Sequence, residues 1–347
     1  MKYYNWKKTI PKKELIEVCE YIKKGEIVIF PTETVYGIGA NAFDEKAVQK
    51  IFTAKGRPAD NPLIVHVADH LEITKITQNI TKIEQKLIHE FMPGPFTLIL
   101  KKNAKIPDIV SGGLDTVAVR MPKHAIAKQI IANSKVPIAA PSANISGKPS
   151  GTTIEDIQKE LAPKVHAIID GGETQIGLES TVVKVINETP YILRPGKITP
   201  EQIKKVTGKV EFANGIFTPV KENEKVESPG LKHKHYAPKT PAILLYSQDE
   251  KRLLMEVNKK IEAYQGKVVV LGFEEHKEKI KVPQNQFISL GSKNNLEQIA
   301  KNLYTLLRKA DQLEAYKIII EGVPKQGIGI AIMNRLLRTC GYNYTEF

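Results

Sequence analysis

Residues 25–31 of the chain read GEIVIFP, and the four apolar residues at 27–30 predict a short buried strand that ends at Pro31. Before this strand, apolar residues recur at helical spacing over 12–24 and predict an amphipathic helix. After it, Asp44 is a suitable N-cap for a second helix that runs to about Ala54. Strands and helices thus interleave from the start, which is typical of an α/β fold.

Similar segments follow as far as residue 206, but they do not alternate strictly. Further strands are predicted at 63–67, 96–100, 116–120, 137–140, 167–170, 180–185 and 191–194, and further helices at 81–92, 124–133 and 198–206. Because runs of strands are mixed with single helices, we expect a mixed, twisted sheet with helices packed on it. Residues 1–206 are predicted to form this first domain.

A polar stretch with several prolines and glycines, residues 207–240, separates this domain from the rest. A segment of this length is predicted to be a linker, a lid, or both. Residues 241–347 then alternate apolar strands with helices, which predicts a small Rossmann-like α/β domain with a parallel sheet. Its strands are expected at 242–246, 267–273, 287–290 and 317–323, and its helices at 250–264, 294–313 and 327–340.

The composition excludes several classes of protein. The chain has 347 residues, of which 41% are hydrophobic and 26% charged, as in ordinary globular proteins. Two cysteines are too few for a zinc ribbon or a disulfide-stabilised scaffold. No apolar run reaches the ~20 residues of a membrane span and no signal peptide is recognisable, so we expect a cytoplasmic protein without membrane contact.

The net charge of +13 favours polyanionic ligands such as nucleotides, phosphates or RNA. No P-loop is present, so phosphates would be bound in another way. Lys55-Gly56-Arg57 offers a point charge and a guanidinium fork two residues apart. Residues 141–147, PSANISG, offer small hydroxyl and amide groups after a strand. Each segment also fits an ordinary surface turn, so the residues alone leave both interpretations open.

Polar residues also lie at the ends of predicted strands. Arg120 ends an apolar strand, where arginine often binds a carboxylate or phosphate, and a structural ion pair is the alternative. His66 ends another strand, where a core histidine is the alternative. Residues 37–42, GIGANA, imitate a dinucleotide-binding fingerprint but lack its acidic residue about twenty positions on, so a tight turn is predicted. Further strand-end groups are Thr32-Glu33-Thr34 and Glu179-Ser180-Thr181.

Taken together, these segments resemble the YrdC-domain family. The resemblance is carried by FPTETVYGIGANA (30–42), GRPADNPLIVHV (56–67), MPGPFTLIL (92–100), LDTVAVRMP (114–122), PIAAPSANISGKPS (137–150) and GLESTVV (177–183). It covers about residues 15–205. SPGLKHKHYAP (228–238) resembles the linker of the family's two-domain form, and residues 241–347, with GIGIAIMNR (327–335), resemble its C-terminal domain. The chain is therefore similar to the two-domain threonylcarbamoyladenylate synthases.

This resemblance implies a reaction and a set of site residues. L-threonine, bicarbonate and ATP would give threonylcarbamoyl-AMP and pyrophosphate, for the threonylcarbamoyladenosine modification of tRNA beside the anticodon. Arg120 would bind the threonine carboxylate, and Lys55 and Arg57 would act in catalysis. The threonine contacts that it implies are Thr34, His66, Arg120, Ala140 and Ser180. The implied ATP contacts are Lys55, Arg57, Asn61, Thr116, Ser142, Asn144, Ser150, Arg194 and Tyr236.

The resemblance also carries expectations about cofactors and partners. Mg²⁺ would arrive with ATP and take most of its ligands from ATP and water, with no metal ligands from the protein. Tyr236 lies in the linker, so the linker would fold over the site as a lid. The product would pass to other tRNA-modification proteins, and weak RNA binding is possible.

Three other functions are considered beside this one. A carbamoyltransferase of the hydrogenase-maturation type contains a similar domain, but its Cys-rich zinc motifs cannot come from two cysteines. An RNA-binding module would grip a nucleic-acid backbone with its basic surface. A nucleotide-sensing regulator would use the C-terminal domain to report ligand state. The last two do not exclude the enzyme.

Overall fold

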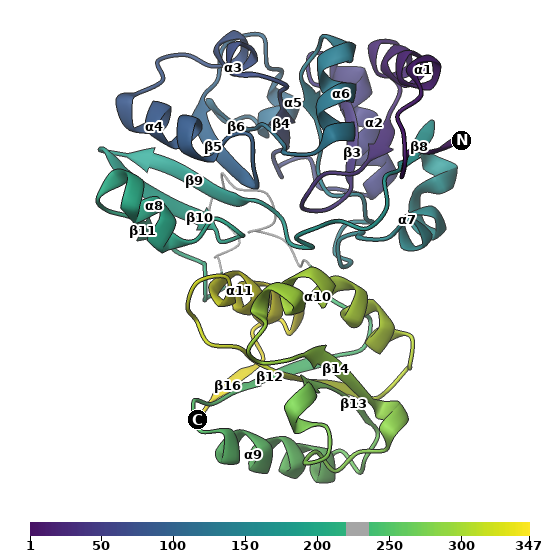
Figure 1. Cartoon of the computed structure of the whole chain (residues 1–347), viewed down its shortest axis with the longest axis vertical. Helices are drawn as coiled ribbons and strands as arrows, with labels where there is room; N and C mark the ends of the chain where they lie inside the picture. Colours follow the sequence, from purple (N-terminus) through teal and green to yellow (C-terminus); the bar gives the residue numbers. More distant parts are fainter. Residues whose placement is uncertain (220–235) are drawn as a thin grey trace. The chain divides into compact units, whose positions relative to one another are not determined.

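The chain folds into two compact units (Figure 1). The computed structural model describes residues 1–219 and 236–347. Residues 1–146 and 150–216 belong to the first unit, and residues 147–149, 217–219 and 236–347 to the second. The 228–238 signature lies largely outside the described residues, and the predicted linker or lid at 207–240 lies outside them at 220–235.

Within residues 1–219, eleven strands form one sheet in the order β1-β8-β2-β3-β7-β4-β6-β5-β9-β10-β11. Parallel and antiparallel pairs are both present, which confirms the predicted mixed sheet. The strands are β1 (Lys2–Asn5), β2 (Val28–Phe30), β3 (Gly37–Asn41), β4 (Ile64–His66), β5 (Phe96–Lys101), β6 (Thr116–Arg120), β7 (Ile138–Ala139), β8 (Ala167–Asp170), β9 (Thr181–Ile186), β10 (Thr189–Arg194) and β11 (Glu211–Phe212).

Helices cover this sheet unevenly. The helices are α1 (Lys12–Lys23), α2 (Glu45–Lys55), α3 (His70–Ile76), α4 (Lys82–Phe91), α5 (Asp108–Ser111), α6 (Ala125–Ser134), α7 (Ile154–Leu161) and α8 (Pro200–Thr207). Residues of α2, α4, α7 and α8 build the main core on one face of the sheet. On the opposite face, α1 and α6 pack against β2, β7 and β8.

The rest of that opposite face, over β4, β5, β6, β9 and β10, carries a small apolar cluster. Its buried members are Ile64, Ile99, Ala118, Val182 and Leu193, all of them strand residues. Within residues 1–219, no helix contributes to this cluster. Side chains alternate between the two faces of a strand, so the polar neighbours of these residues at i ± 2 lie on the same side. We therefore expect a ligand site on this half of the sheet.

The prediction of a tight turn at residues 37–42 is wrong, because these residues form β3 between β2 and β7. Neither Gly37 nor Gly39 has a positive φ, so backbone freedom is not why glycine stands there. A Cβ on Gly39 would lie 2.5 Å from the Phe30 ring and 2.7 Å from Cγ2 of Ile138. The glycine is needed for space, because it lets the Phe30 ring of the neighbouring strand approach β3 closely.

Replacing Gly39 with alanine is expected to destabilise the first unit by about 1–3 kcal/mol, because the new methyl group overlaps two packed side chains. Gly37→Ala is the matched control in the same strand, because its nearest neighbour would be the Ala140 Cβ at 3.4 Å. Thermal unfolding should show a clearly lower midpoint for Gly39→Ala than for Gly37→Ala. Equal midpoints would show that close packing does not explain this glycine.

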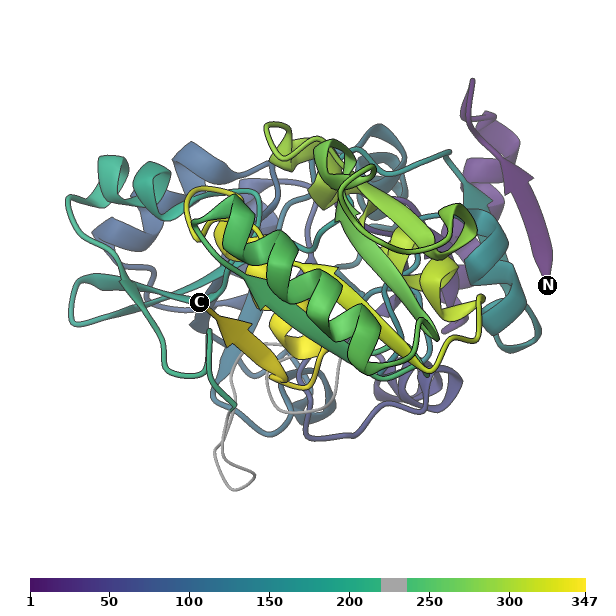
Figure 2. The ribbon, with the colours of Figure 1, turned by 90° about the horizontal axis from the view of Figure 1, so that it is seen from below.

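In the second unit, the described strands form a fully parallel sheet in the order β14-β13-β15-β12-β16. They are β12 (Ala242–Tyr246), β13 (Val268–Phe273), β14 (Phe287–Gly291), β15 (Lys317–Glu321) and β16 (Tyr344–Glu346). One face is covered by α9 (Glu250–Ala263), which lies across the strands in Figure 2, and the other by α10 (Leu296–Asp311) and α11 (Gly329–Thr339). The predicted Rossmann-like parallel α/β fold is confirmed.

Candidate functional site

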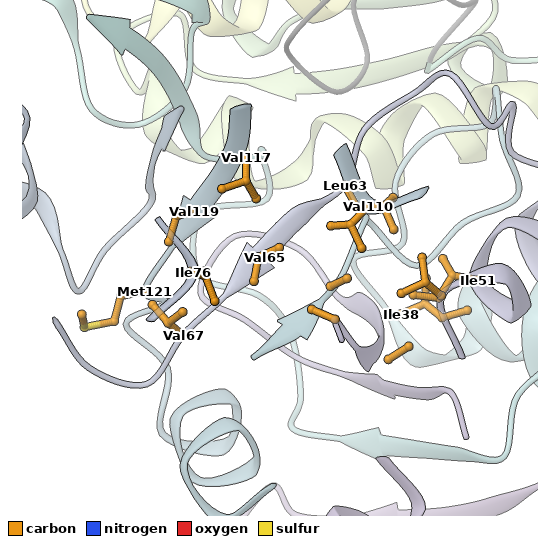
Figure 3. Packing of buried hydrophobic residues seen from close by; sticks show 14 of the residues in the cluster. Ile38, Ile51, Leu63, Val65, Val67, Ile76, Val110, Val117, Val119 and Met121 are labelled. Atoms are coloured by element: carbon orange, nitrogen blue, oxygen red, sulfur yellow. The ribbon is translucent and has the colours of Figure 1, made fainter. Parts of the chain in front are cut away.

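The helix-free half of the sheet brings His66 and Arg120 together. Val65 in β4 and Val119 in β6 point into the main core (Figure 3). Because side chains alternate, His66 and Arg120 point to the opposite face. The two strands are parallel and His66 is the register partner of Arg120, so the two side chains are neighbours at the carboxyl ends of β4 and β6.

Arg120 is buried and only partly satisfied. Its Nη2 lies 2.8 Å from Oε2 of Glu33, which is also buried. This Nη2 contact is an ion pair without hydrogen-bond geometry, and Nε has no hydrogen-bond partner among the described residues. Buried donors are almost always paired in folded proteins. The ion pair that the sequence left as an alternative is therefore present, and it still leaves guanidinium donors for a carboxylate ligand.

His66 is buried in the same place and is uncharged near neutral pH. Its Nδ1 lies 3.2 Å from the backbone oxygen of Ile64. Burial, together with the charge of Arg120, lowers the pKa of His66 to about 3. The imidazole therefore offers a neutral hydrogen-bonding edge, not a second cation, beside the guanidinium.

Ser180, another predicted threonine contact, is held by residues of β5 and β10. Its Oγ lies 2.7 Å from Oγ1 of Thr97 and accepts a hydrogen bond from Nη2 of Arg194 at 3.1 Å. Arg194 Nε also donates to the backbone oxygen of Ser180 at 3.1 Å. Arg194 thus holds Ser180 in place directly before β9. Thr97 was not predicted as a site residue, because it stands in the apolar run of β5.

Thr34 and Ala140 are buried on the β3–β7 side of the site. The Thr34 hydroxyl lies 2.8 Å from that of Thr32, and the Thr34 carbonyl accepts a hydrogen bond from Gly177 N at 3.0 Å. Ala140 N donates to the carbonyl of Ile64, two residues before His66 in β4. The loop after β2 is thus tied to the segment that leads to Ser180, and Ala140 is tied to β4.

Lys55 ends α2 and is directed into the protein. The helix begins at Asp44, whose side chain accepts from Lys46 N and Ala47 N, as predicted. Lys55 is 1% exposed, and its Nζ donates to the backbone oxygens of Ser142 and Asn144, each at 2.5 Å. Burial, and to a lesser degree the charge of Arg57, lowers the pKa of Lys55 well below its usual value. The interpretation as a solvated basic turn is therefore wrong.

Arg57 and Asn61 form one local structure with Pro58 and Pro62. Arg57 is 8% exposed, and it donates from Nε to the backbone oxygen of Asn61 and from Nη2 to that of Pro62. The Nδ2 of Asn61 is buried without a hydrogen-bond partner among the described residues. The segment after α2 is therefore a preformed basic corner with a spare amide donor.

The PSANISG segment lies against Lys55 and is linked onward to Ser180. Ser142 Oγ donates to Oδ1 of Asn144 at 2.6 Å. Ser150, which is fully buried, donates to Oε1 of Glu179 at 2.6 Å. Because Glu179 precedes Ser180, this bond connects the loop region to the threonine-site candidates. Glu33 and Glu179 were predicted only as strand-end groups, without a role of their own.

Two predicted ATP contacts, Thr116 and Tyr236, belong to other elements of the described chain. Thr116 begins β6 and Arg120 ends it, so the two residues are about 13 Å apart along the strand. Tyr236 belongs to the second unit, where its ring stacks on Tyr304 with centroids 5.2 Å apart and also faces the Arg335 guanidinium. A role for Tyr236 and Thr116 at the ATP site stays a prediction.

The described part of the chain contains no group of three or more His, Cys, Asp or Glu side chains placed to hold a metal ion. Over the same residues, no helix is both long enough and apolar enough to cross a membrane. Cys19 and Cys340 are both buried and neither is in a disulfide.

Comparison with known proteins identifies the family. A family model described as "Telomere recombination" matches residues 20–196, and one described as "Threonylcarbamoyl-AMP synthase, C-terminal domain" matches residues 198–341. The threonylcarbamoyl-AMP synthase of Pyrococcus abyssi is 43% identical over 93% of this chain and 92% of its own. The chain belongs to the threonylcarbamoyl-AMP synthase family. The Bacillus subtilis threonylcarbamoyl-AMP synthase is 42% identical over 94% of this chain and 93% of its own.

The resemblance to threonylcarbamoyl-AMP synthases extends over the whole fold. The crystal structure of P. abyssi Sua5 complexed with L-threonine matches with a TM-score of 0.92 and 41% identity, covering 100% of both chains. The chain is therefore an enzyme of the family that makes an AMP-linked intermediate, and the role in tRNA modification follows from that family. The predicted two-domain family is confirmed.

Proposed function

We propose that this chain condenses L-threonine, bicarbonate and ATP to threonylcarbamoyl-AMP and pyrophosphate in the first unit. The observation that carries the proposal is the buried Arg120, which keeps an unused donor beside His66 on the sheet face whose apolar cluster has no helix member within residues 1–219. A guanidinium with spare donors suits the carboxylate of an amino acid. Membership of the family supports the same reaction.

The threonine site proposed here consists of Thr34, His66, Arg120, Ala140 and Ser180. Arg120 would bind the carboxylate, and Glu33 would keep the guanidinium in place through its 2.8 Å ion pair. The neutral His66 and the hydroxyls of Thr34 and Ser180 are candidates for the threonine hydroxyl and amine. Buried polar groups of this kind would be left unpaired by an analogue that lacks the hydroxyl, which supplies selectivity.

The ATP site proposed here is built around Lys55 and Arg57, the two catalytic candidates. Lys55 uses two of its three ammonium donors on the backbone of Ser142 and Asn144, which leaves one for a phosphate oxygen. The other ATP contacts proposed are Asn61, Thr116, Ser142, Asn144, Ser150, Arg194 and Tyr236. Mg²⁺ bound to ATP would screen the phosphate charges and take its remaining ligands from water.

For this reaction, the protein mainly has to position the substrates and stabilise the developing charge. Bicarbonate and the threonine amine condense to a carbamate with loss of water. A carbamate oxygen then attacks the α-phosphorus of ATP, the bond to the bridging oxygen breaks, and pyrophosphate leaves. Lys55 and Arg57 would stabilise the charge that develops on the phosphates, while the buried sheet face excludes water from the unstable product.

The proposal is tested by pyrophosphate release from ATP with Mg²⁺ and bicarbonate, with and without L-threonine. Release should depend on L-threonine and fall at least ~10-fold when serine or valine replaces it, because each lacks part of the side chain that the site contacts. Release that is independent of threonine, or that is equally fast with valine, would contradict the proposal. A non-catalytic RNA-binding or nucleotide-sensing role would bind its ligand without any release.

We further propose that the enzyme acts in the cytoplasm and passes its product to other tRNA-modification proteins. The family role in tRNA modification supports both expectations. The net charge of +13 also fits weak RNA binding, which would not require sequence-specific contacts.

A further inference from the structure

The second unit contains a cleft of about 630 Å³ at the carboxyl ends of its parallel strands. Its walls come from the residues after β12, β13, β14 and β15, and from the end of β16, on the side where the C-terminus lies in Figure 1. A volume of this size is within the range of small-molecule sites in proteins. The function proposed for the first unit makes no use of it.

The cleft lies at the switch point of the sheet. β12 and β15 are neighbours, but the chain leaves β12 toward α9 on one face and leaves β15 toward α11 on the other. Connections that diverge in this way open a crevice between two parallel strands, and ligands of open α/β sheets bind at that place. Tyr246 is the last residue of β12 and Gly322 directly follows β15, so the two lie beside each other across this pair of strands. Both residues line the cleft.

A buried acid–histidine pair, Glu321 and His276, reaches the cleft through its histidine. Glu321 is fully buried at the end of β15, and its carboxylate accepts from Nδ1 of His276 and from Phe273 N, both at 2.7 Å. His276 is 1% exposed and lines the cleft, and its Nε2 has no hydrogen-bond partner among the described residues. The carboxylate of Glu250 lies 3.5 Å from this Nε2, too far for a good hydrogen bond. The nitrogen is itself buried and faces this carboxylate, so a ligand group would bind it in exchange for Glu250.

Burial lowers the pKa of His276, while the carboxylates of Glu321 and Glu250 raise it, and the sum is a raised pKa. The protonated ring would present Nε2–H as a donor, because Nδ1–H is already given to Glu321. An anionic oxygen of a ligand would satisfy this donor.

The charges that line the cleft are balanced. Lys293 contacts Glu250, and Lys325 lies 2.8 Å from Glu346. Both pairs are partly exposed to solvent, so their ionic contacts are weak and can be exchanged for contacts with a ligand. A ligand with net negative charge would be repelled by the carboxylates, and one with net positive charge would be repelled by the lysines. A ligand that carries both charges meets a partner for each.

A phosphate ligand is disfavoured at the position where Rossmann-like folds bind one. The N-terminus of α9 is capped by the chain's own Asp249, whose carboxylate accepts from Lys251 N and Arg252 N. These amides would otherwise bind the phosphate. The connection from β12 to α9, SQD at 247–249, also has no glycine that would let a phosphate approach the backbone.

We propose that this cleft is a second ligand site of the enzyme, and that it binds a small zwitterion of the α-amino-acid class. The ligand carboxylate would bind His276 Nε2 and Lys293, and its ammonium group would bind the carboxylates of the cleft. Gln248, Asn294 and Gln326, which also line it, provide amide groups for a polar side chain. This proposal does not depend on the reaction proposed for the first unit.

Isothermal titration calorimetry of the full-length chain tests the site with L-glutamine, L-asparagine and L-threonine as probes. N-acetyl-L-glutamine and L-glutamine amide are matched probes that each lack one of the two charges. Lys293→Gln and Asn294→Ala change exposed cleft residues, so both variants should fold. Lys281→Gln removes an exposed lysine that does not line the cleft and is the control.

We expect at least one of the three amino acids to bind, and its affinity to fall ~10-fold or more in Lys293→Gln while Lys281→Gln binds normally. Removing either ligand charge should weaken binding by a similar factor. The proposal is overturned if none of the three amino acids binds, if the matched probes bind as tightly, or if Lys293→Gln leaves every affinity unchanged. Threonine binding at the first site alone would produce the last result, with pyrophosphate release intact.

Discussion

Replacing Arg120 with alanine is expected to weaken L-threonine binding by about 100-fold or more while ATP binding changes by less than about threefold. The reason is that the threonine carboxylate would lose a buried two-pronged donor, for which water is a poor replacement at a site this deeply buried. Separate titrations of the variant with L-threonine and with ATP give the two affinities. Equal losses for both ligands would contradict the assignment of Arg120 to the threonine carboxylate.

The stability of this variant needs its own control. Glu33 would keep a buried charge without its partner, which typically costs about 3–5 kcal/mol. The double variant Arg120→Met with Glu33→Gln removes both charges and should unfold near the wild-type temperature. It should still lack threonine binding and retain ATP binding. Threonine affinity that recovers in the double variant would show that Arg120 has only a structural role.

Replacing Lys55 with methionine is expected to weaken ATP binding by ~10–100-fold and to reduce turnover further, with threonine binding affected less. The methionine keeps most of the buried volume but has no ammonium group for a phosphate or for the backbone oxygens of Ser142 and Asn144. Lys50→Met on the exposed side of the same helix is the matched control and should bind ATP normally. ATP affinities that are equal in the two variants would contradict the role of Lys55.

The wild-type protein should also show a pH dependence that Lys55→Met lacks. The ammonium form binds phosphate, and burial lowers the pKa of Lys55 below its usual value of 10.5. ATP affinity should therefore fall as pH rises through this lowered pKa, at a lower pH than for an exposed lysine. A series of ATP titrations at increasing pH measures this. A decrease of the same size in Lys55→Met would assign the effect to another group.

Most of the fold could be predicted because its strands are short apolar runs bounded by proline, glycine or polar residues. Residues 27–30 and 116–120 are examples, and both form strands in the structure. Elements without such a run were not predicted. β1 is KYYN, which has little apolar character and is held at the sheet edge by its register with β8. In α7, Ile154, Ile157 and Leu161 do have helical spacing, but they follow a loop rich in turn-forming residues.

The sequence shows glycine at positions 37 and 39, but it does not show why glycine is required there. Backbone freedom and lack of space call for the same residue type, and only the packing of Phe30 and Ile138 distinguishes them. The candidate site shows a similar limit. Arg120 could be found because charge at a strand end is unusual, whereas Thr97 could not, because a threonine inside a strand is common. The contact of Thr97 with Ser180 depends on the pairing of β5 with β9, and neither segment's sequence predicts that pairing.

The central claim is that carbon from bicarbonate enters an AMP-linked product of threonine. The most direct test is to incubate the enzyme with ATP, Mg²⁺, L-threonine and ¹³C-bicarbonate and to determine the product mass. We expect threonylcarbamoyl-AMP that is one mass unit heavier than the product from unlabelled bicarbonate. An unlabelled threonyl-AMP, in which the amino-acid carboxylate itself has attacked the phosphorus, would contradict it.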